Sequence, residues 1–244
     1  MLAAACLLLA TGVAAGGEPG RADPMDRSLF LSQGDATKRE SGTAFFVKVS
    51  GRTLLVTAAH VAEETRDSAD LGFRDADGTG RRLPLRAVVA GGRDPWRTHP
   101  SLDVAAAVVD WGRVAEEDRS RLRRLVWPDG SLSAEPPPRG TAVRLVGFPA
   151  LKGIGDGMSA TVLCGHVATR PITSRGDWGE VRAVYMTPPA DGGASGSPVY
   201  VPGEVPRLCG LAYGVSYARD AARYTKLVAA DDLAAFLRGV AAGP

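Results

Sequence analysis

Apolar residues recur along the chain in short runs, some alternating with polar residues and some continuous, and glycine, proline or aspartate bounds the runs. Runs of this length and period are typical of β-strands. A charged, roughly helical stretch at 113–127 and the proline-rich SLSAEPPPRG divide the pattern into two sets of six. The candidate strands lie at 28–33, 42–49, 52–59, 71–74, 83–90 and 103–111, and then at 141–148, 159–169, 181–187, 197–201, 207–217 and 224–229.

The two sets predict an all-β protein of two six-stranded antiparallel β-barrels, because closing a sheet into a barrel removes its exposed strand edges. We expect an N-terminal barrel at 26–112, a linker at 113–139 and a C-terminal barrel at 140–244 that ends in a short helix formed by DDLAAFLRGV. The chain has 244 residues, 45% of them hydrophobic, which is enough for a sizeable core.

The N-terminus, residues 1–15, is apolar and rich in small residues, and it is too short to span a membrane. Val13 and Ala15 precede Gly16 as a signal-peptidase site requires. We therefore interpret residues 1–15 as a signal peptide and expect a secreted or periplasmic protein. No lysine or arginine lies near Met1, which leaves a mis-assigned start or a disordered tail as the alternative.

Charge and cysteine content bear on binding functions. The net charge is +2, and the basic tract RSRLRR fits a solvated helix face better than a nucleic-acid-binding surface. In an exported chain, Cys164 and Cys209 could form one disulfide or remain two buried thiols. The cysteines and histidines lack the spacing of a zinc site, so we predict no metal and no cofactor.

The stretch GGASGSPV sets a serine, Ser195, among glycines, and the three histidines, His60, His99 and His166, all precede it. A serine hydrolase needs a base for the hydroxyl proton and a carboxylate that orients the base. The α/β-hydrolases are excluded, because their histidine follows the serine. His60 ends the run TLLVTAAH and Asp103 opens DVAAAVVDW, so both are expected at strand ends, whereas His99 is expected in an exposed turn.

These blocks resemble those of the trypsin-like, or chymotrypsin-fold, serine peptidases. VTAAHV is similar to the family's T-A-A-H block, LDVAAAVV to its D-I-A-L-L block and GASGSPV to its G-D-S-G-G-P block. The order His, Asp, Ser is that of the family, and the separations of 43 and 92 residues are similar. GVSYA and RYTKLV resemble the segments that line its specificity pocket. The resemblance covers about residues 28–240 and is closer to bacterial members than to animal zymogens, because most of the animal disulfide cysteines are missing.

The resemblance implies a serine endopeptidase that hydrolyses peptide bonds through an acyl-enzyme. Ser195 would be the nucleophile, His60 the general base and then acid, and Asp103 the carboxylate that orients His60. The N–H groups of Gly193 and Ser195 would form the oxyanion hole, because glycine at 193 lets the backbone curl. Ser216 matches a family serine that supports the Asp–His pair.

The same resemblance implies a specificity pocket with its base at Pro189. Its walls would run through Ser216, Tyr217, Ala218 and Ala222. None of these side chains is negatively charged, so a buried lysine or arginine of the substrate would lose its hydration without gaining an ion pair. We expect small or medium apolar residues to be preferred, unless Asp191 or Asp220 points into the pocket.

Ala194 departs from the family pattern, since many members have aspartate or asparagine there. In the zymogen-type enzymes that acid pairs with a freshly cut N-terminus, and alanine cannot make the pair. We therefore expect activity without proteolytic activation beyond signal-peptide removal, with a peptide or protein as substrate, no nucleic-acid partner and no stable membrane insertion. The alternative is a catalytically silent peptidase-fold protein that binds peptides or protein partners.

Overall fold

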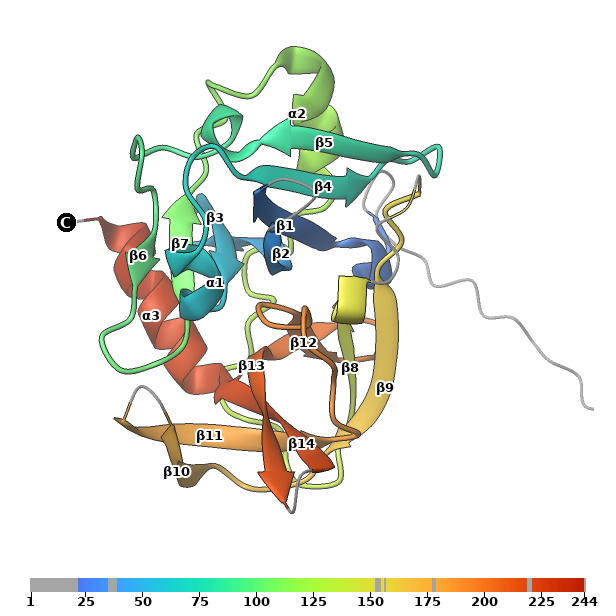
Figure 1. Ribbon diagram of the computed structural model, residues 1–244, viewed down its shortest axis with the longest axis vertical. Helices are drawn as coiled ribbons and strands as arrows, with labels where there is room; N and C mark the ends of the chain where they lie inside the picture. Colours follow the sequence, from blue (N-terminus) through green and yellow to red (C-terminus); the bar gives the residue numbers. More distant parts are fainter. Residues whose placement is uncertain are drawn as a thin grey trace, which may run out of the picture.

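The computed structural model of the chain describes residues 22–34, 39–151, 155, 157–176, 179–218 and 221–243. The signal peptide predicted at 1–15 lies outside them. The described part is mostly β-structure, in two antiparallel sheets that occupy the upper and lower halves of Figure 1. The helices are short, and one of them runs beside both halves.

The first sheet has seven strands in the order β5–β4–β1–β2–β3–β7–β6. Along the chain, the 3-10 turn η1 (Pro24–Asp26) precedes β1, the helix α1 (Ala59–Glu63) follows β3, and the 3-10 turn η2 (Leu85–Ala87) follows β5. The strands are β1 (Ser28–Gly34), β2 (Arg39–Val49), β3 (Arg52–Thr57), β4 (Asp70–Arg74), β5 (Gly80–Pro84), β6 (Arg97–Thr98) and β7 (Ala105–Val108).

The second sheet also has seven strands, in the order β10–β11–β14–β13–β12–β8–β9, and β11 pairs with β9 as well. This extra pairing closes six strands into a barrel, with β10 added to β11. The strands are β8 (Ala142–Gly147), β9 (Thr161–Val167), β10 (Ile172–Gly176), β11 (Gly179–Thr187), β12 (Pro198–Val201), β13 (Arg207–Ala218) and β14 (Ala221–Ala229). The fold is the predicted double barrel of the chymotrypsin type.

The strands of the first sheet are buried on both faces where they meet the second half. In β1, Leu29 and Leu31 join the main core, while Phe30 points the other way and contacts Phe148 and Met158. The rings of Phe30 and Phe148 meet edge to face with centroids 5.5 Å apart. This two-sided burial explains why the residues LFL at 29–31 form a continuous apolar run rather than an alternating one.

The main core extends through both halves of the molecule. It joins the first sheet to residues of β12, β13 and β14 and to both longer helices, α2 (Glu116–Arg123) and α3 (Ala230–Ala242). In α3, Leu233, Leu237 and Val240 form one buried face at helical spacing, and the helix contacts strands of both sheets (Figure 1). The predicted C-terminal helix is thereby confirmed, and it helps to hold the two halves together.

Three strands were missed or misplaced by the sequence pattern. The strand expected at 83–90 ends at Pro84, and the chain then turns through η2. The strand that precedes this turn, GRRLP, has no fully buried residue, so it carries no hydrophobic period. The strand β6, which has only two residues, and the strand β10, with the sequence ITSRG, also lack an apolar alternation and were missed. They are the reason why each sheet has seven strands instead of the six expected.

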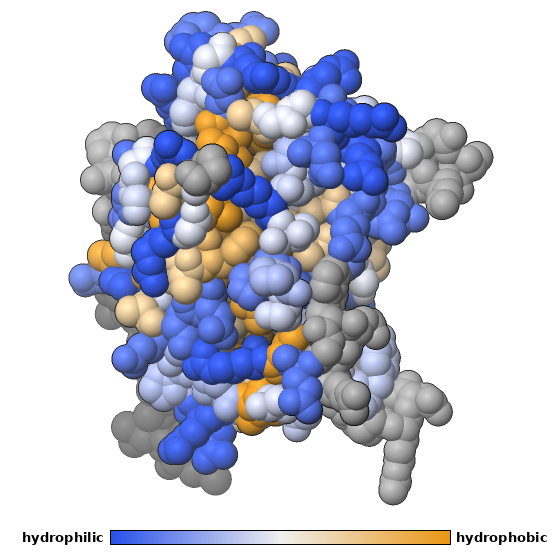
Figure 2. Space-filling model, turned by 90° about the vertical axis from the view of Figure 1, so that its left-hand side faces the viewer, coloured by the Kyte–Doolittle hydropathy of each residue, from blue (hydrophilic) through white to orange (hydrophobic). Residues whose placement is uncertain are grey.

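The face that carries α3 and β6 is covered mainly by hydrophilic residues, with apolar residues visible in its middle (Figure 2). Among the described residues, no helix has both the length and the apolar character needed to cross a membrane.

Candidate active site

His60 lies on α1, directly after the buried strand β3. The small residues Ala59 and Ala62 of this helix pack on Ala105 of β7 and on Trp96. Because these side chains are small, α1 approaches β7 closely, and His60 comes to lie beside the residue two positions before the start of β7. That residue is Asp103.

The carboxylate of Asp103 binds His60 twice. Its Oδ2 lies 2.7 Å from the ring Nδ1 of His60, and its Oδ1 accepts a hydrogen bond from the His60 backbone N–H at 3.0 Å. The Asp103 side chain is 6% exposed and the His60 side chain 42% exposed. The buried carboxylate therefore sets the orientation of an accessible imidazole, whose other ring nitrogen, Nε2, remains available for chemistry.

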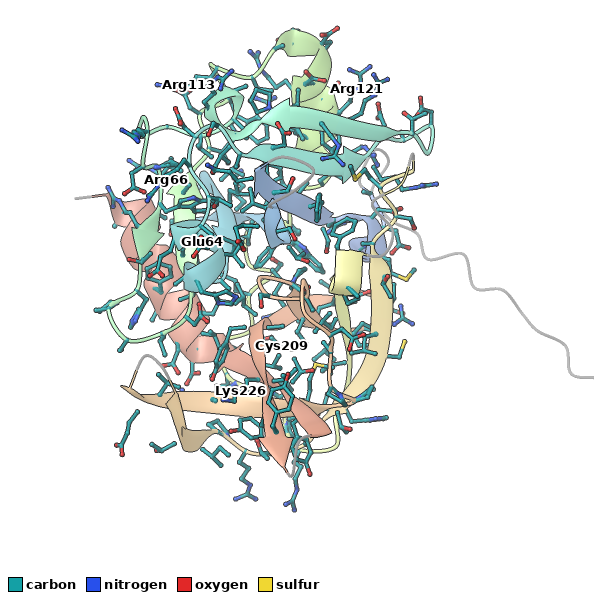
Figure 3. All side chains as sticks on the ribbon, viewed as in Figure 1. Glu64, Arg66, Arg113, Arg121, Cys209 and Lys226 are labelled. Carbon is teal, nitrogen blue, oxygen red and sulfur yellow. The ribbon has the colours of Figure 1, made fainter. Side chains whose placement is uncertain are left out.

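The electrostatics of the pair favour a strong base. Partial burial opposes the charge on the His60 imidazole, but the hydrogen bond and the negative charge of Asp103 outweigh this effect. The negative charges of Glu63, at the end of α1, and Glu64, which follows the helix and is labelled in Figure 3, also favour the protonated imidazole. The pKa of His60 is therefore raised above its ordinary value of 6.5.

Ser195 lies in a tight loop framed by two glycines in the left-handed region. Gly193 has φ +90° and Gly196 has φ +87°. A Cβ on Gly196 would lie 1.9 Å from the carbonyl oxygen of Thr43, and one on Gly193 would lie 2.6 Å from that of Phe148, so both positions require glycine. Backbone geometry thus dictates the two glycines of GASGSPV.

The loop docks on the first sheet next to α1. The Ser195 carbonyl accepts a hydrogen bond from the Thr43 N–H at 2.8 Å. Between them and the helix lies Gly42, where a Cβ would be 2.7 Å from a methyl group of Val61 and 3.1 Å from the Ser195 oxygen. Val61 follows His60 directly, so the structure brings the backbone of Ser195 next to the helix that carries His60.

Two backbone N–H groups of this loop are available to a ligand. The Gly192 carbonyl accepts from the Ala150 N–H at 2.5 Å, and the Ala194 carbonyl accepts from the Ser197 N–H at 3.0 Å. A trans peptide directs its C=O and N–H to opposite sides, so the N–H groups of Gly193 and Ser195 point away from those donors. Within the described ranges neither N–H has a bonded acceptor. Such free donors can bind a developing oxyanion.

The sequence profile of the trypsin-like peptidase domain matches residues 42–205, more than half of the chain, and this range includes His60, Asp103 and Ser195. The chain belongs to the trypsin-like peptidase family. The membership supports a peptidase function for this trypsin-like domain. No curated protein matches the sequence.

Solved structures of similar fold are distant in sequence. The active form of the Rv3671c protease from M. tuberculosis is 20% identical with a TM-score of 0.56, over 88% of this chain and 80% of that one. The thermostable serine protease AL20 from an extremophilic microorganism is 14% identical with a TM-score of 0.56, over 90% and 99%. The MamO protease domain from Magnetospirillum magneticum is 12% identical with a TM-score of 0.59, over 87% and 96%. At these identities the likeness shows the fold.

Thr43 connects the two halves of this trypsin-like domain. Its fully buried hydroxyl donates to the Gly193 carbonyl at 3.0 Å and accepts from the Phe148 N–H at 3.1 Å. Its carbonyl accepts from the Thr57 hydroxyl at 2.7 Å. Sequence reasoning missed Thr43, because the partners of its hydroxyl are more than 100 residues away along the chain.

The residues predicted to form the walls of the specificity pocket lie along the hairpin of β13 and β14. Ser216 pairs with Tyr224 in β13 and β14, and Tyr217, 70% exposed, pairs with Ala222 close to the end of the hairpin. The side chains of Ala218 and Ala222, and all of Asp220, lie outside the described part of the chain. Asp191 is exposed. The role of these residues in substrate binding stays a prediction.

Within the described part of the chain, the hydrogen bonds between the hairpin and the segment of Pro189, the predicted base of the specificity pocket, are made by Thr225 and not by the predicted wall residues. Pro189 is half-buried, and the next residue, Ala190, donates its N–H to the hydroxyl of Thr225 at 2.8 Å. Thr225 is buried and donates to the Pro188 carbonyl at 3.2 Å, and its cross-strand partner is Val215. Two β-branched side chains therefore stand on the strands beside the segment that leads to Ser195.

Tyr213 is a β13 residue on which the charge of Asp103 acts. Its hydroxyl is buried and has no hydrogen-bond partner among the described residues. Burial raises the pKa of Tyr213, and the charges of Tyr185 and Asp103 raise it further. The hydrogen bonds of Ala212 with Gly196 and Ser197 fix the register of β13 beside the nucleophile loop. The supporting role expected of Ser216 stays a prediction.

Cys164 and Cys209 are both free thiols, so the disulfide alternative is not realised. Cys164 is exposed on β9, and Cys209 is buried on β13 in the lower half of the molecule (Figure 3). Burial raises the pKa of Cys209 to about 12. Cys209 is therefore a small core residue, and Cys164 is the accessible one of these two thiols.

Proposed function

We propose that this chain is an exported serine endopeptidase that cleaves peptide bonds through an acyl-enzyme formed on Ser195. The observation that carries the proposal is the double contact of Asp103 with His60, on a helix that only Gly42 separates from the backbone of Ser195. Export rests on the signal peptide interpreted at residues 1–15.

In the first half of the reaction, the Ser195 hydroxyl attacks the scissile carbonyl, and Nε2 of His60 takes the hydroxyl proton. Asp103 holds Nδ1–H and stabilises the imidazolium that forms. The N–H groups of Gly193 and Ser195 bind the oxyanion of the tetrahedral intermediate. His60 then gives the proton to the leaving amine, and the bond between the carbonyl carbon and this nitrogen breaks.

In the second half, His60 takes a proton from water, and the resulting hydroxide attacks the acyl-enzyme ester. Collapse of the second intermediate returns the proton to Ser195 and releases the acid product. Ala194 is buried in the nucleophile loop and offers no carboxylate to a new N-terminus. The chain is therefore active as produced once the signal peptide is removed.

The proposed substrate residue before the scissile bond is small or medium and apolar. The β-branched Thr225, which binds the Ala190 N–H, and its cross-strand partner Val215 support this proposal, because branched side chains beside the 188–190 segment would leave room for a small or medium residue. Neither side chain carries a negative charge that could offset the desolvation of a lysine or arginine of the substrate.

The test is labelling of the purified chain with a fluorophosphonate, which reacts only with an activated serine. Wild-type protein is expected to be labelled and to cleave peptides, whereas Ser195→Ala and His60→Ala lose both properties while keeping the wild-type circular dichroism spectrum. Loss of a nucleophile or base costs on the order of 10⁶ in turnover in such a unit. A well-folded wild-type chain that resists the label would instead support the alternative, a silent protein that binds peptides or protein partners.

A further inference from the structure

Asp103 lies inside the loop of a short hairpin. Thr98 of β6 pairs with Ala105 of β7, and the His99 N–H donates to the Val104 carbonyl at 3.0 Å. The residues enclosed by this hydrogen bond, 100–103, include Asp103. The position of the carboxylate that holds His60 therefore depends on the conformation of this loop.

The ring of His99 sets that conformation. Its Nδ1 accepts hydrogen bonds from the N–H groups of Ser101 at 3.1 Å and Leu102 at 3.0 Å. A side chain that accepts from the N–H groups two and three positions further along is the usual role of asparagine, aspartate or serine in a turn. Here an imidazole plays it, one residue before Pro100, which donates no N–H.

An imidazole nitrogen can accept only while it carries no proton. In the neutral ring the proton of His99 therefore lies on Nε2, and a second proton would turn Nδ1 into a donor that faces two other donors. Protonation of His99 must break both bonds to the loop. Asparagine or aspartate at this position would not have this limit near neutral pH.

The surroundings of His99 come from three elements. Its ring meets the ring of Phe236 edge to face with centroids 5.5 Å apart, and together they line a pocket between the loop, β11 and α3. Partial burial lowers the pKa of His99; Asp232 favours the protonated ring, but it is bonded to Arg182 at 2.9 Å. The charged groups facing this pocket are Glu180 and Arg182 of β11 and Asp232 of α3, with Asp231 bound to Arg182.

We propose that His99 is a positioning residue for the peptidase proposed above: its unprotonated Nδ1 holds the loop that carries Asp103, and its protonation releases that loop. The turnover of the enzyme then depends on two histidines. His60 must be unprotonated to act as a base, and His99 must be unprotonated to keep Asp103 in place.

The kinetic test compares His99→Asn, which keeps an acceptor, with His99→Ala, which has none. In His99→Ala, kcat falls by about tenfold or more with little change in KM, because small misplacements of catalytic groups cost up to roughly 10²-fold. His99→Asn stays within about threefold of wild type, since its amide oxygen accepts the same two bonds. His166→Ala, at the exposed histidine of β9, is the matched control and leaves kcat unchanged.

The pH profile separates positioning from a merely structural role. For wild type, log kcat/KM falls with the slope of one proton below the raised pKa of His60, and around the lowered pKa of His99 it falls more steeply, by an additional factor of about ten as in His99→Ala. His99→Asn keeps the slope of one proton throughout. Equal slopes in the two proteins, or an asparagine variant as impaired as the alanine variant, would overturn the inference.

A second measurement does not need activity and is made in the Ser195→Ala background. The pKa of His99 is lower in the folded chain, so its contribution to stability is complete above the unfolded pKa of about 6.5 and is lost as the pH falls toward the folded pKa. Between pH 7 and 5, the free energy of unfolding should therefore fall more steeply in the chain that keeps His99 than in the chain that also carries His99→Asn. Parallel curves would refute the switch even in a chain that proves catalytically silent.

Discussion

Removal of the Thr43 hydroxyl tests whether its hydrogen bonds hold the nucleophile loop in place. Thr43→Val keeps the branched shape and removes the hydroxyl that joins the Gly193 carbonyl to the Phe148 N–H. A buried group left without its partner costs about 1–3 kcal/mol, and here there are two such groups. The two groups together would lower the free energy of unfolding by roughly 2–6 kcal/mol. We expect the lower half of this range, about 2–4 kcal/mol, because the bond to Gly193 is only partly buried. This is a large share of a typical stability of about 5–15 kcal/mol.

Activity should suffer as well, because the Gly193 carbonyl belongs to the residue whose N–H is proposed to bind the oxyanion. Removing one oxyanion donor outright costs about 10²–10³ in kcat, so loosening it should cost on the order of 10- to 100-fold. The loss is expected in kcat and in the rate of fluorophosphonate labelling, with KM little changed, since the donors act mainly in the transition state.

Thr43→Ser is the matched control, because it keeps the hydroxyl and loses one methyl group, at a cost of about 1 kcal/mol. Urea denaturation of both variants gives the stability difference, and peptide hydrolysis gives kcat and KM. If the valine variant is as stable and as active as the serine variant, the hydroxyl does not hold the loop, and the reasoning fails.

Three further predictions concern the site and the cysteines. Activity should be lost as the pH falls through a kcat/KM midpoint above 6.5, because Asp103 raises the pKa of His60 and only the neutral imidazole is a base; a midpoint below 6.5 would contradict this. In the native protein a thiol reagent should modify Cys164, and Cys209 only after unfolding, as peptide mapping would show; equal labelling of both in the native state would disagree with the burial of Cys209. Among matched peptides with Ala, Leu, Phe or Arg before the scissile bond, those with Ala or Leu should be cleaved best. Val215→Gly should raise kcat/KM for the Phe peptide relative to the Ala peptide by about tenfold, within the range expected for a few methyl groups in a pocket. If this ratio is unchanged, Val215 does not line the pocket.

Most of the strands, the double-barrel fold and the order of the candidate triad could be read from the sequence. Long apolar strands such as TLLVT and the terminal helix bury a regular face, and burial imposes a periodic pattern. The glycines around Ser195 were also readable, because a left-handed φ and a crowded Cβ position exclude other residues. Strands with exposed arginines, such as GRRLP, leave no such pattern and were missed.

The contacts that build the site were decided by tertiary structure alone. Thr43 reaches Gly193 and Phe148 only because the two sheets pack together, and no local pattern encodes that packing. The hydrogen bonds of Ala212 with Gly196 and Ser197 set the register of β13, and because side chains alternate along a strand, this register decides which of its residues face the nucleophile loop. His99 was expected to be an exposed turn residue, yet its ring nitrogen holds the loop of Asp103. A sequence shows which residues can accept a hydrogen bond, but only the folded backbone determines which donors come within reach.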